Sequence, residues 1–119
     1  MSSPLHFQRY QEFKRALEQL RMIIAATQLQ EATLRESFQN VQQIFERQIA
    51  SLSADDIAPE HAARWQSIQT EIYKQMRLLA TDIMLLQASR SPATSQRRVL
   101  GVRTRLDTLI QYCEALLQL

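Results

Sequence analysis

Glycine is almost absent from this chain of 119 residues, which has one, Gly101, where average usage gives roughly eight. Proline is also sparse, at three residues. Loops that cradle a phosphate need glycine so that the backbone can approach the ligand, and β-rich domains need glycine-bearing turns. The shortage therefore excludes nucleotide-binding loops and β-folds.

Cysteine and long apolar runs are equally scarce. Cys113 is the single cysteine, so no disulfide can form within the chain. No apolar run approaches the length of about 20 residues that spans a bilayer. The first residues have no apolar core of the kind found in a secretory signal. Together these absences predict a cytoplasmic protein.

Four segments repeat apolar residues at steps of three and four, the spacing of one helix face. Their spacing predicts an all-α fold, an antiparallel four-helix bundle with a long third helix, within a single domain over residues 1–119. The expected helices cover about 5–26, 33–52, 60–89 and 92–117.

Particular residues define the expected buried stripes. The first stripe begins with Phe7 and Tyr10. The third follows an eleven-residue rhythm that includes Ile68 and Ile72, which predicts a nearly straight helix. The fourth, with Cys113 on it, has the alternating three-and-four spacing of a coiled-coil seam.

The helix boundaries differ in how clearly they are marked. Thr33 and Glu36 match a capping box at the start of the second helix. Pro59, and Ser91 with Pro92, are suited to begin the third and fourth helices. No glycine or proline separates the first two helices, so one long helix through residues 27–32 remains an alternative. Gly101 lies inside the fourth helix, where close approach of another backbone would explain it.

The third helix carries more apolar residues than one bundle would cover. Leu78, Met84 and Leu85 are this surplus. A helix that is apolar nearly all round must be buried on more than one side, so these residues predict a homodimer surface. The alternative is loose packing of the three side chains within one bundle.

Catalytic and metal-binding patterns are absent, so we expect no enzyme activity, no metal and no cofactor. His6 and His61 stand outside any metal-binding spacing, and each is expected on the surface or at a helix cap. Cys113, on its seam, is expected to be a buried apolar residue. Asp82 lies beside an apolar stripe and should pair with an arginine from the fourth helix.

Basic residues are concentrated in the second half of the chain. No acidic residue lies between Asp82 and Asp107. Such a cluster can pair with acids of neighbouring helices, or it can bind nucleic acid or an acidic protein. It lacks aromatic residues and a short recognition helix, which weighs against nucleic acid. The cluster consists of Arg90, Arg97, Arg98, Arg103 and Arg105.

The segment 69–98 resembles the cyanobacterial heterocyst frequency control protein PatD family, and positions near the end of the chain fit the same family. The matching positions are Gln69, Thr70, Glu71, Ile72, Lys74, Gln75, Arg77, Leu78, Leu79, Asp82, Gln87, Ala88, Arg90, Ala93, Thr94, Arg105, Leu106, Leu109, Tyr112 and Cys113.

This resemblance implies a cytoplasmic, non-enzymatic regulator. It implies binding to the tubulin-like cell-division protein FtsZ, modulation of FtsZ assembly and an influence on heterocyst frequency. A nucleic-acid-binding module and a structural partner subunit remain the alternatives. The residues expected to contact the partner are Glu71, Lys74, Arg77, Arg90, Arg97 and Arg98.

Overall fold

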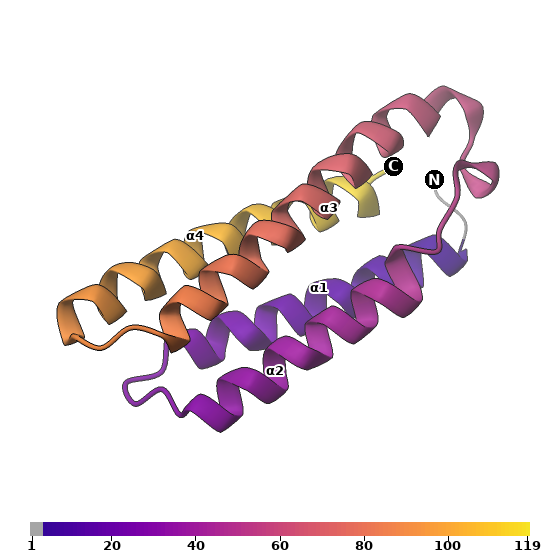
Figure 1. The fold of residues 1–119 in the computed structure, drawn as a ribbon. Coiled ribbons are helices and arrows are strands. Elements are labelled where there is room, and N and C mark those ends of the chain that lie inside the picture. The colour runs from indigo at the N-terminus through magenta and orange to yellow at the C-terminus, as the bar shows by residue number, and fades with distance from the viewer. Residues whose placement is uncertain (1–3) are drawn as a thin grey trace.

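The computed structural model describes residues 4–119, and all of its regular structure is helical (Figure 1). The expected helix ranges are confirmed to within three residues at every end except that of the second helix, where the last turns take a wider form. The elements are α1 (Pro4–Ile24), α2 (Glu31–Ile44), the π-helix η1 (Phe45–Ile49), the 3-10 helix η2 (Ala54–Asp56), α3 (Pro59–Gln87) and α4 (Pro92–Leu117).

The four long helices run antiparallel to their neighbours in a bundle measuring 50 × 20 × 19 Å. The start of α1 and the end of α4 lie at the same end of the bundle, and the α1–α2 and α3–α4 turns lie at the other (Figure 1). α1 packs against α2 and α4, and α3 packs against α4. The backbones of α2 and α3 hardly approach each other, so one long side of the bundle is open.

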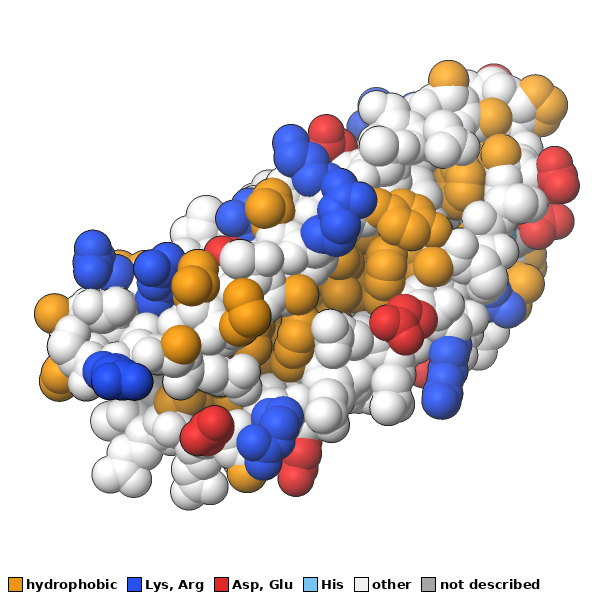
Figure 2. All heavy atoms as spheres, in the orientation of Figure 1, with side chains coloured by type: hydrophobic (Ala, Val, Ile, Leu, Met, Phe, Trp, Pro, Cys, Tyr) orange, Lys and Arg blue, Asp and Glu red, His pale blue; other side chains and the backbone are white. Residues whose placement is uncertain are grey.

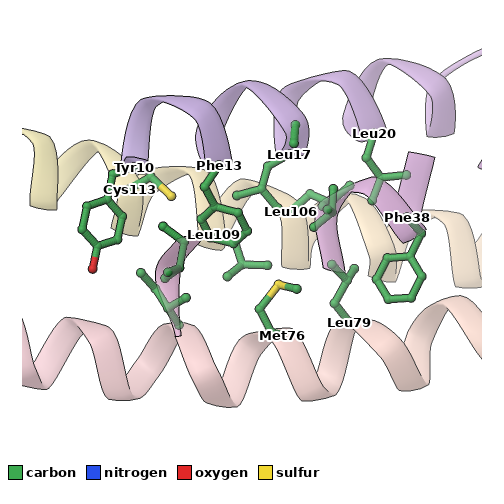
Figure 3. Close-up of a cluster of buried hydrophobic side chains, with 14 of the residues drawn as sticks. Tyr10, Phe13, Leu17, Leu20, Phe38, Met76, Leu79, Leu106, Leu109 and Cys113 are labelled. Carbon is green, nitrogen blue, oxygen red and sulfur yellow. The ribbon is translucent and has the colours of Figure 1, made fainter. Parts of the chain in front are cut away.

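The core is a continuous seam to which every long helix contributes. Tyr10, Phe13 and Leu17 of α1 point toward Leu106 and Leu109 of α4 (Figure 3). Met76 and Leu79 of α3 and Phe38 of α2 complete the cluster (Figure 3). Cys113 is fully buried in this seam, as its position predicted.

Two polar residues take core positions that the sequence analysis assigned to apolar neighbours. His6, and not Phe7, belongs to the buried face of α1, while Phe7 is exposed. Gln69, and not Ile68, lies in the buried stripe of α3, and Ile68 is half-buried. The expectation that His6 lies on the surface or caps a helix is therefore wrong.

The buried residues of α3 follow a seven-residue seam without a break. The eleven-residue rhythm was therefore wrong, because it was built on Ile68. With Gln69 in its place, steps of four and three alternate along the whole helix, as coiled-coil packing requires. The seam consists of Trp65, Gln69, Ile72, Met76, Leu79, Ile83 and Leu86.

The π-helix η1 corrects the phase of the second helix. Continuing the three-and-four spacing of Val41 and Phe45 would bring Gln48 into the core. A π-helix adds a residue to the turn, and here the amide of Ala50 bonds to the Phe45 carbonyl at 2.8 Å. Ile49 is fully buried as a result. The extra residue thus exchanges a polar core side chain for an apolar one.

The helix ends agree with the proline signals and disagree with the capping box. Ser91 accepts a hydrogen bond from the Thr94 amide at 3.2 Å and caps α4, as predicted. α2 begins at Glu31, so Thr33 is already inside its first turn and caps nothing. Residues 25–30 are not helical, so α1 and α2 are two helices rather than one.

Gly101 does not mark a close backbone approach, so that expectation is wrong. It is exposed within α4, and a Cβ at this position would meet no atom within 4 Å. By contrast, the expected pairing of Asp82 with an arginine of the fourth helix is confirmed. Arg105 donates from Nε to Asp82 Oδ2 at 3.0 Å and from Nη1 to Gln75 at 3.0 Å.

Candidate functional site

An open cavity of about 640 Å³ lies at the end of the bundle where the two tight turns meet. Its walls are mainly apolar, and hydroxyl and amide side chains lie among them. Leu100 is one of the lining residues and is 58% exposed, so the cavity is open to solvent on that side. The lining residues are Ile24, Ala26, Thr27, Leu29, Glu31, Leu34, Leu86, Gln87, Ser95, Gln96, Val99 and Leu100.

Local sequence explains why the core leaves this cavity. Traced back from Val102, the α4 seam reaches Val99 and then Ser95, whose small side chain cannot fill a core position. The α1 seam ends at Ile24, and the next seam position is Thr27 in the turn. The apolar seams therefore end before the two turns close.

Three exposed arginines lie at the same end of the bundle as the cavity, outside its lining. Arg90 lies in the α3–α4 turn, and Arg97 and Arg98 follow the lining residue Gln96 on α4. Within residues 4–119 none of the three pairs with an acidic side chain; Arg97 only donates to the Thr94 hydroxyl at 3.4 Å. Figure 2 shows Lys and Arg side chains gathered at this left-hand end.

The acids nearest to these arginines in sequence are already neutralised by other partners. Asp82 is held by Arg105, and Asp107 accepts from Nε and Nη2 of Arg21 on α1. Hydrogen bonding and charge attraction by Asp107 raise the pKa of Arg21 above its usual value. Among residues 4–119, Glu31 is the one carboxylate that lines the cavity. The three arginines at this end of the bundle therefore carry uncompensated positive charge.

The predicted contact residues fall into two groups. Arg90, Arg97 and Arg98 form the group at the end cavity. Lys74 and Arg77 are exposed in the middle of α3, and Glu71 nearby is half-exposed. Arg77 lies ten residues before the end of α3, about 15 Å along the helix axis. The structure thus separates what the sequence treated as one surface.

The predicted dimer residues also divide between two faces of α3. Met84 is 59% exposed and lies one helical turn after Ala80, on the flank that faces α2. Leu78 is 36% exposed, and Leu85, one heptad later, is half-buried. These two leucines share the face that points away from the core.

A buried hydrogen-bond network, for which the sequence carries no local signal, joins three elements at the other end of the bundle. Trp65 donates from Nε1 to the Tyr10 hydroxyl at 3.0 Å, and that hydroxyl donates to Gln69 Oε1 at 2.6 Å. Gln69 then donates to the Ile49 carbonyl at 3.0 Å. Burial raises the pKa of Tyr10 well above its usual value, against the lowering effect of the Trp65 hydrogen bond.

Three side chains cap the carbonyl end of the second helix. Arg9 donates to the Gln48 carbonyl at 3.2 Å, Gln69 to that of Ile49, and Tyr73 to that of Ala50 at 2.8 Å. The last carbonyls of a helix have no partner within it, so these donors satisfy them. The helix dipole also stabilises a cation at this end. These hydrogen bonds therefore hold the end of the second helix against α1 and α3.

The buried titratable groups sit in apolar surroundings. His6 packs against the rings of Tyr10 and Trp65, and its Nε2 lies 3.8 Å from Asp56 Oδ2. Burial lowers the pKa of His6, and the Asp56 carboxylate partly opposes that shift. Burial also raises the pKa of the Cys113 thiol far above its usual value. Neither residue borders the end cavity.

Among residues 4–119, no three His, Cys, Asp or Glu side chains lie close enough together to hold a metal ion. None of the helices in that range is both long and apolar enough to cross a membrane. No protein-family model, no curated protein and no solved structure matches the chain. The geometry and the resemblance to PatD are thus the grounds for a functional proposal.

Proposed function

We propose that this chain is a non-enzymatic regulator that binds an acidic protein partner at the end cavity. The observation that carries the proposal is a mainly apolar cavity of about 640 Å³ at an end of the bundle that also holds three arginines without an acidic partner among residues 4–119. Apolar side chains of a partner segment can fill such a cavity while its carboxylates pair with the guanidinium groups.

The chemistry of the lining favours binding over catalysis. It offers hydroxyl and amide groups and the single carboxylate of Glu31. Catalysis of acyl or group transfer needs a nucleophile, a base and an oxyanion donor at one point, and the lining residues do not supply that set. Protein-binding surfaces, in contrast, need buried apolar anchors surrounded by a polar rim.

The resemblance to PatD supports a particular partner, the cell-division protein FtsZ. In this proposal the cytoplasmic chain binds FtsZ, modulates its assembly and thereby influences heterocyst frequency. FtsZ-type proteins are acidic, which suits the positive charge of Arg90, Arg97 and Arg98. Burial of apolar side chains in the cavity adds the affinity that charge attraction by itself does not supply.

Co-sedimentation with FtsZ polymer tests this proposal. The wild-type chain should pellet with the polymer and change the amount of polymer recovered. Reversing the charge of this end of the bundle with Arg90→Glu, Arg97→Glu and Arg98→Glu should abolish co-pelleting. If the wild-type chain neither pellets nor alters the polymer, FtsZ is not the partner.

A matched control separates local from overall charge. Arg15→Glu, Arg47→Glu and Arg64→Glu reverse three exposed arginines elsewhere and produce the same net charge. This variant should keep most of the binding. Equal losses in both triple variants would show that net charge, and not the charge at the cavity end of the bundle, governs binding.

Nucleic acid is the second candidate, favoured by the same three unpaired arginines. Phosphate-driven binding weakens steeply with salt and does not need the cavity. Leu100→Gln should therefore abolish binding of a protein partner and spare nucleic-acid binding, because it removes the apolar contact without adding a negative charge. The side chain of Leu100 is 58% exposed, so the variant should fold normally. Failure to retard any nucleic acid in a gel at low salt would eliminate this candidate.

A further inference from the structure

The open side of the bundle between α2 and α3 is a second apolar surface, distinct from the end cavity. A pocket of about 220 Å³ lies there, formed by η1, α2 and α3. Tyr73 is 36% exposed in it and packs edge-on against Phe45, with ring centroids 5.1 Å apart. Figure 2 shows hydrophobic side chains in this groove between the two helices. The lining residues are Gln42, Phe45, Glu46, Tyr73, Met76, Arg77 and Ala80.

Charges of opposite sign stand on the two rims of this groove. Arg77 borders the pocket from α3, and Glu46 borders it from η1. Both residues are exposed, and neither forms an ion pair within residues 4–119. The groove thus presents one positive and one negative rim on either side of an apolar floor.

We propose that a second copy of this chain occupies the groove, related to the first by a two-fold axis through the pocket. Two-fold symmetry brings the same patch of both copies together, so the patch must be complementary to itself. A two-fold axis that passes through the pocket, parallel to the groove, places the α3 rim of each copy opposite the η1 rim of the other. Arg77 of each copy then meets Glu46 of the other, and the apolar floors cover one another.

The rim charges select this occupant over an acidic helix from another protein. An acidic helix would pair with Arg77 but would bring its carboxylates against Glu46, and like charges at an interface are costly. A second copy satisfies both rims. Ala80, on the same flank, leaves room for close approach of another helix.

The open side is large enough for a stable dimer. The bundle is 50 Å long and about 20 Å wide, so one long side offers on the order of 1,000 Å². A standard interface buries about 800 Å² per partner. Met84 lies on the groove flank of α3 and belongs to this surface, whereas Leu78 and Leu85 point away from it.

Sedimentation equilibrium of the full chain by itself tests the proposal. The wild type should have the mass of a dimer at micromolar concentration. Arg77→Glu and Glu46→Arg should each weaken the dimer at least tenfold, because each places like charges together at two symmetric contacts. The double variant restores opposite charges and should return to the wild-type dissociation constant.

Arg15→Glu, an exposed charge reversal on α1, is the matched control and should leave the dimer intact. Circular dichroism should show equal helicity for all variants, because both groove positions are exposed. A wild type that remains monomeric, a dimer unaffected by the single changes, or a double variant that stays dissociated would each overturn the proposal. The test needs no other protein, so its failure leaves the proposed function standing.

Discussion

Gln69 can occupy a core position because both ends of its amide are used. Its oxygen accepts from Tyr10 and its nitrogen donates to the Ile49 carbonyl, so burial leaves no polar atom of the amide without a partner. The same residue links α1, α3 and η1. A polar residue here therefore stabilises one particular arrangement of three elements.

Gln69→Leu should lower the free energy of unfolding by about 1–3 kcal/mol for each group that it leaves unpaired. Those groups are the Tyr10 hydroxyl and the Ile49 carbonyl. Urea denaturation would measure the loss. Gln66→Leu, an exposed change nearby on α3, is the control and should alter stability by less than about 0.5 kcal/mol. Similar values for the two variants would show that the network contributes nothing.

Gly101 is a place where the protein can be made more stable. It lies in the interior of α4, and an added Cβ meets open space. Alanine is favoured over glycine in a helix by about 1 kcal/mol, so Gly101→Ala should raise the free energy of unfolding by roughly that amount. Thermal denaturation would detect it. A lower melting temperature would mean that the glycine has a role the fold does not reveal.

His6 makes stability depend on pH in the acidic range. Burial lowers its pKa in the folded protein, whereas the unfolded chain keeps a pKa near 6.5. The unfolded state therefore binds the proton first, so the contribution of neutral His6 is present above pH 6.5 and is lost as pH falls.

The free energy of unfolding should thus decrease between about pH 7 and pH 5, by at most about 1.4 kcal/mol per pH unit from this one proton. Urea denaturation at several pH values would measure the slope. His6→Gln has no titrating group at this position, so its slope should be smaller. Parallel curves for the two proteins would contradict this assignment.

At the scale of single elements, the phase of each seam decides which side chains are buried. In α1 the alternating steps run through His6 and Tyr10 to Phe13, and Phe7 falls one residue out of phase. In the second helix the π-helix η1 shifts the phase so that Ile49 replaces Gln48 in the core. One residue of phase is about 100° around a helix, which is enough to move a side chain from core to solvent.

Two identical substitutions in α1 test this phase. Phe13 is fully buried, so Phe13→Ala should cost about 3–5 kcal/mol of stability. Phe7 is 38% exposed, and Phe7→Ala should cost less than about 1 kcal/mol. Denaturant titration of the two variants compares them directly. A larger loss at Phe7 would show that the α1 seam has been placed wrongly.

At the scale of the whole molecule, the bundle is elongated, with a radius of gyration of 15.1 Å for its Cα atoms. The average relation for a compact chain of this length gives roughly 13.5 Å. Elongation separates the end cavity from the groove on the open side. The molecule can therefore bind a partner at its end while a second copy covers its side.

Small-angle X-ray scattering distinguishes the possible dimers. Two bundles lying side by side, with centres about 20 Å apart, should have a radius of gyration of roughly 18 Å. Two bundles joined end to end, with centres about 50 Å apart, should reach roughly 29 Å. The groove interface predicts the smaller value, and a value near the larger one would contradict it.

Helix placement was predictable from the sequence because its signals are local. Apolar spacing located all four helices, and Pro59 and Pro92 located the starts of two. The pairing of Asp82 with an arginine of the fourth helix was predictable for a similar reason, since a carboxylate beside an apolar stripe needs a cation. The candidate arginines were recognisable as a cluster, although their relation to a cavity was not.

What the tertiary structure decided depends on residues far apart in the chain. Gln69 could be recognised as a core residue only once Tyr10 and the Ile49 carbonyl were placed beside it. The end cavity exists because two turns meet where the seams have already ended, and the groove exists because α2 and α3 stay apart. The sequence by itself determined the helices and most of their buried faces, because those follow from local spacing. The packing of distant helices decided where the molecule stays open, because no single segment contains both walls of a cavity.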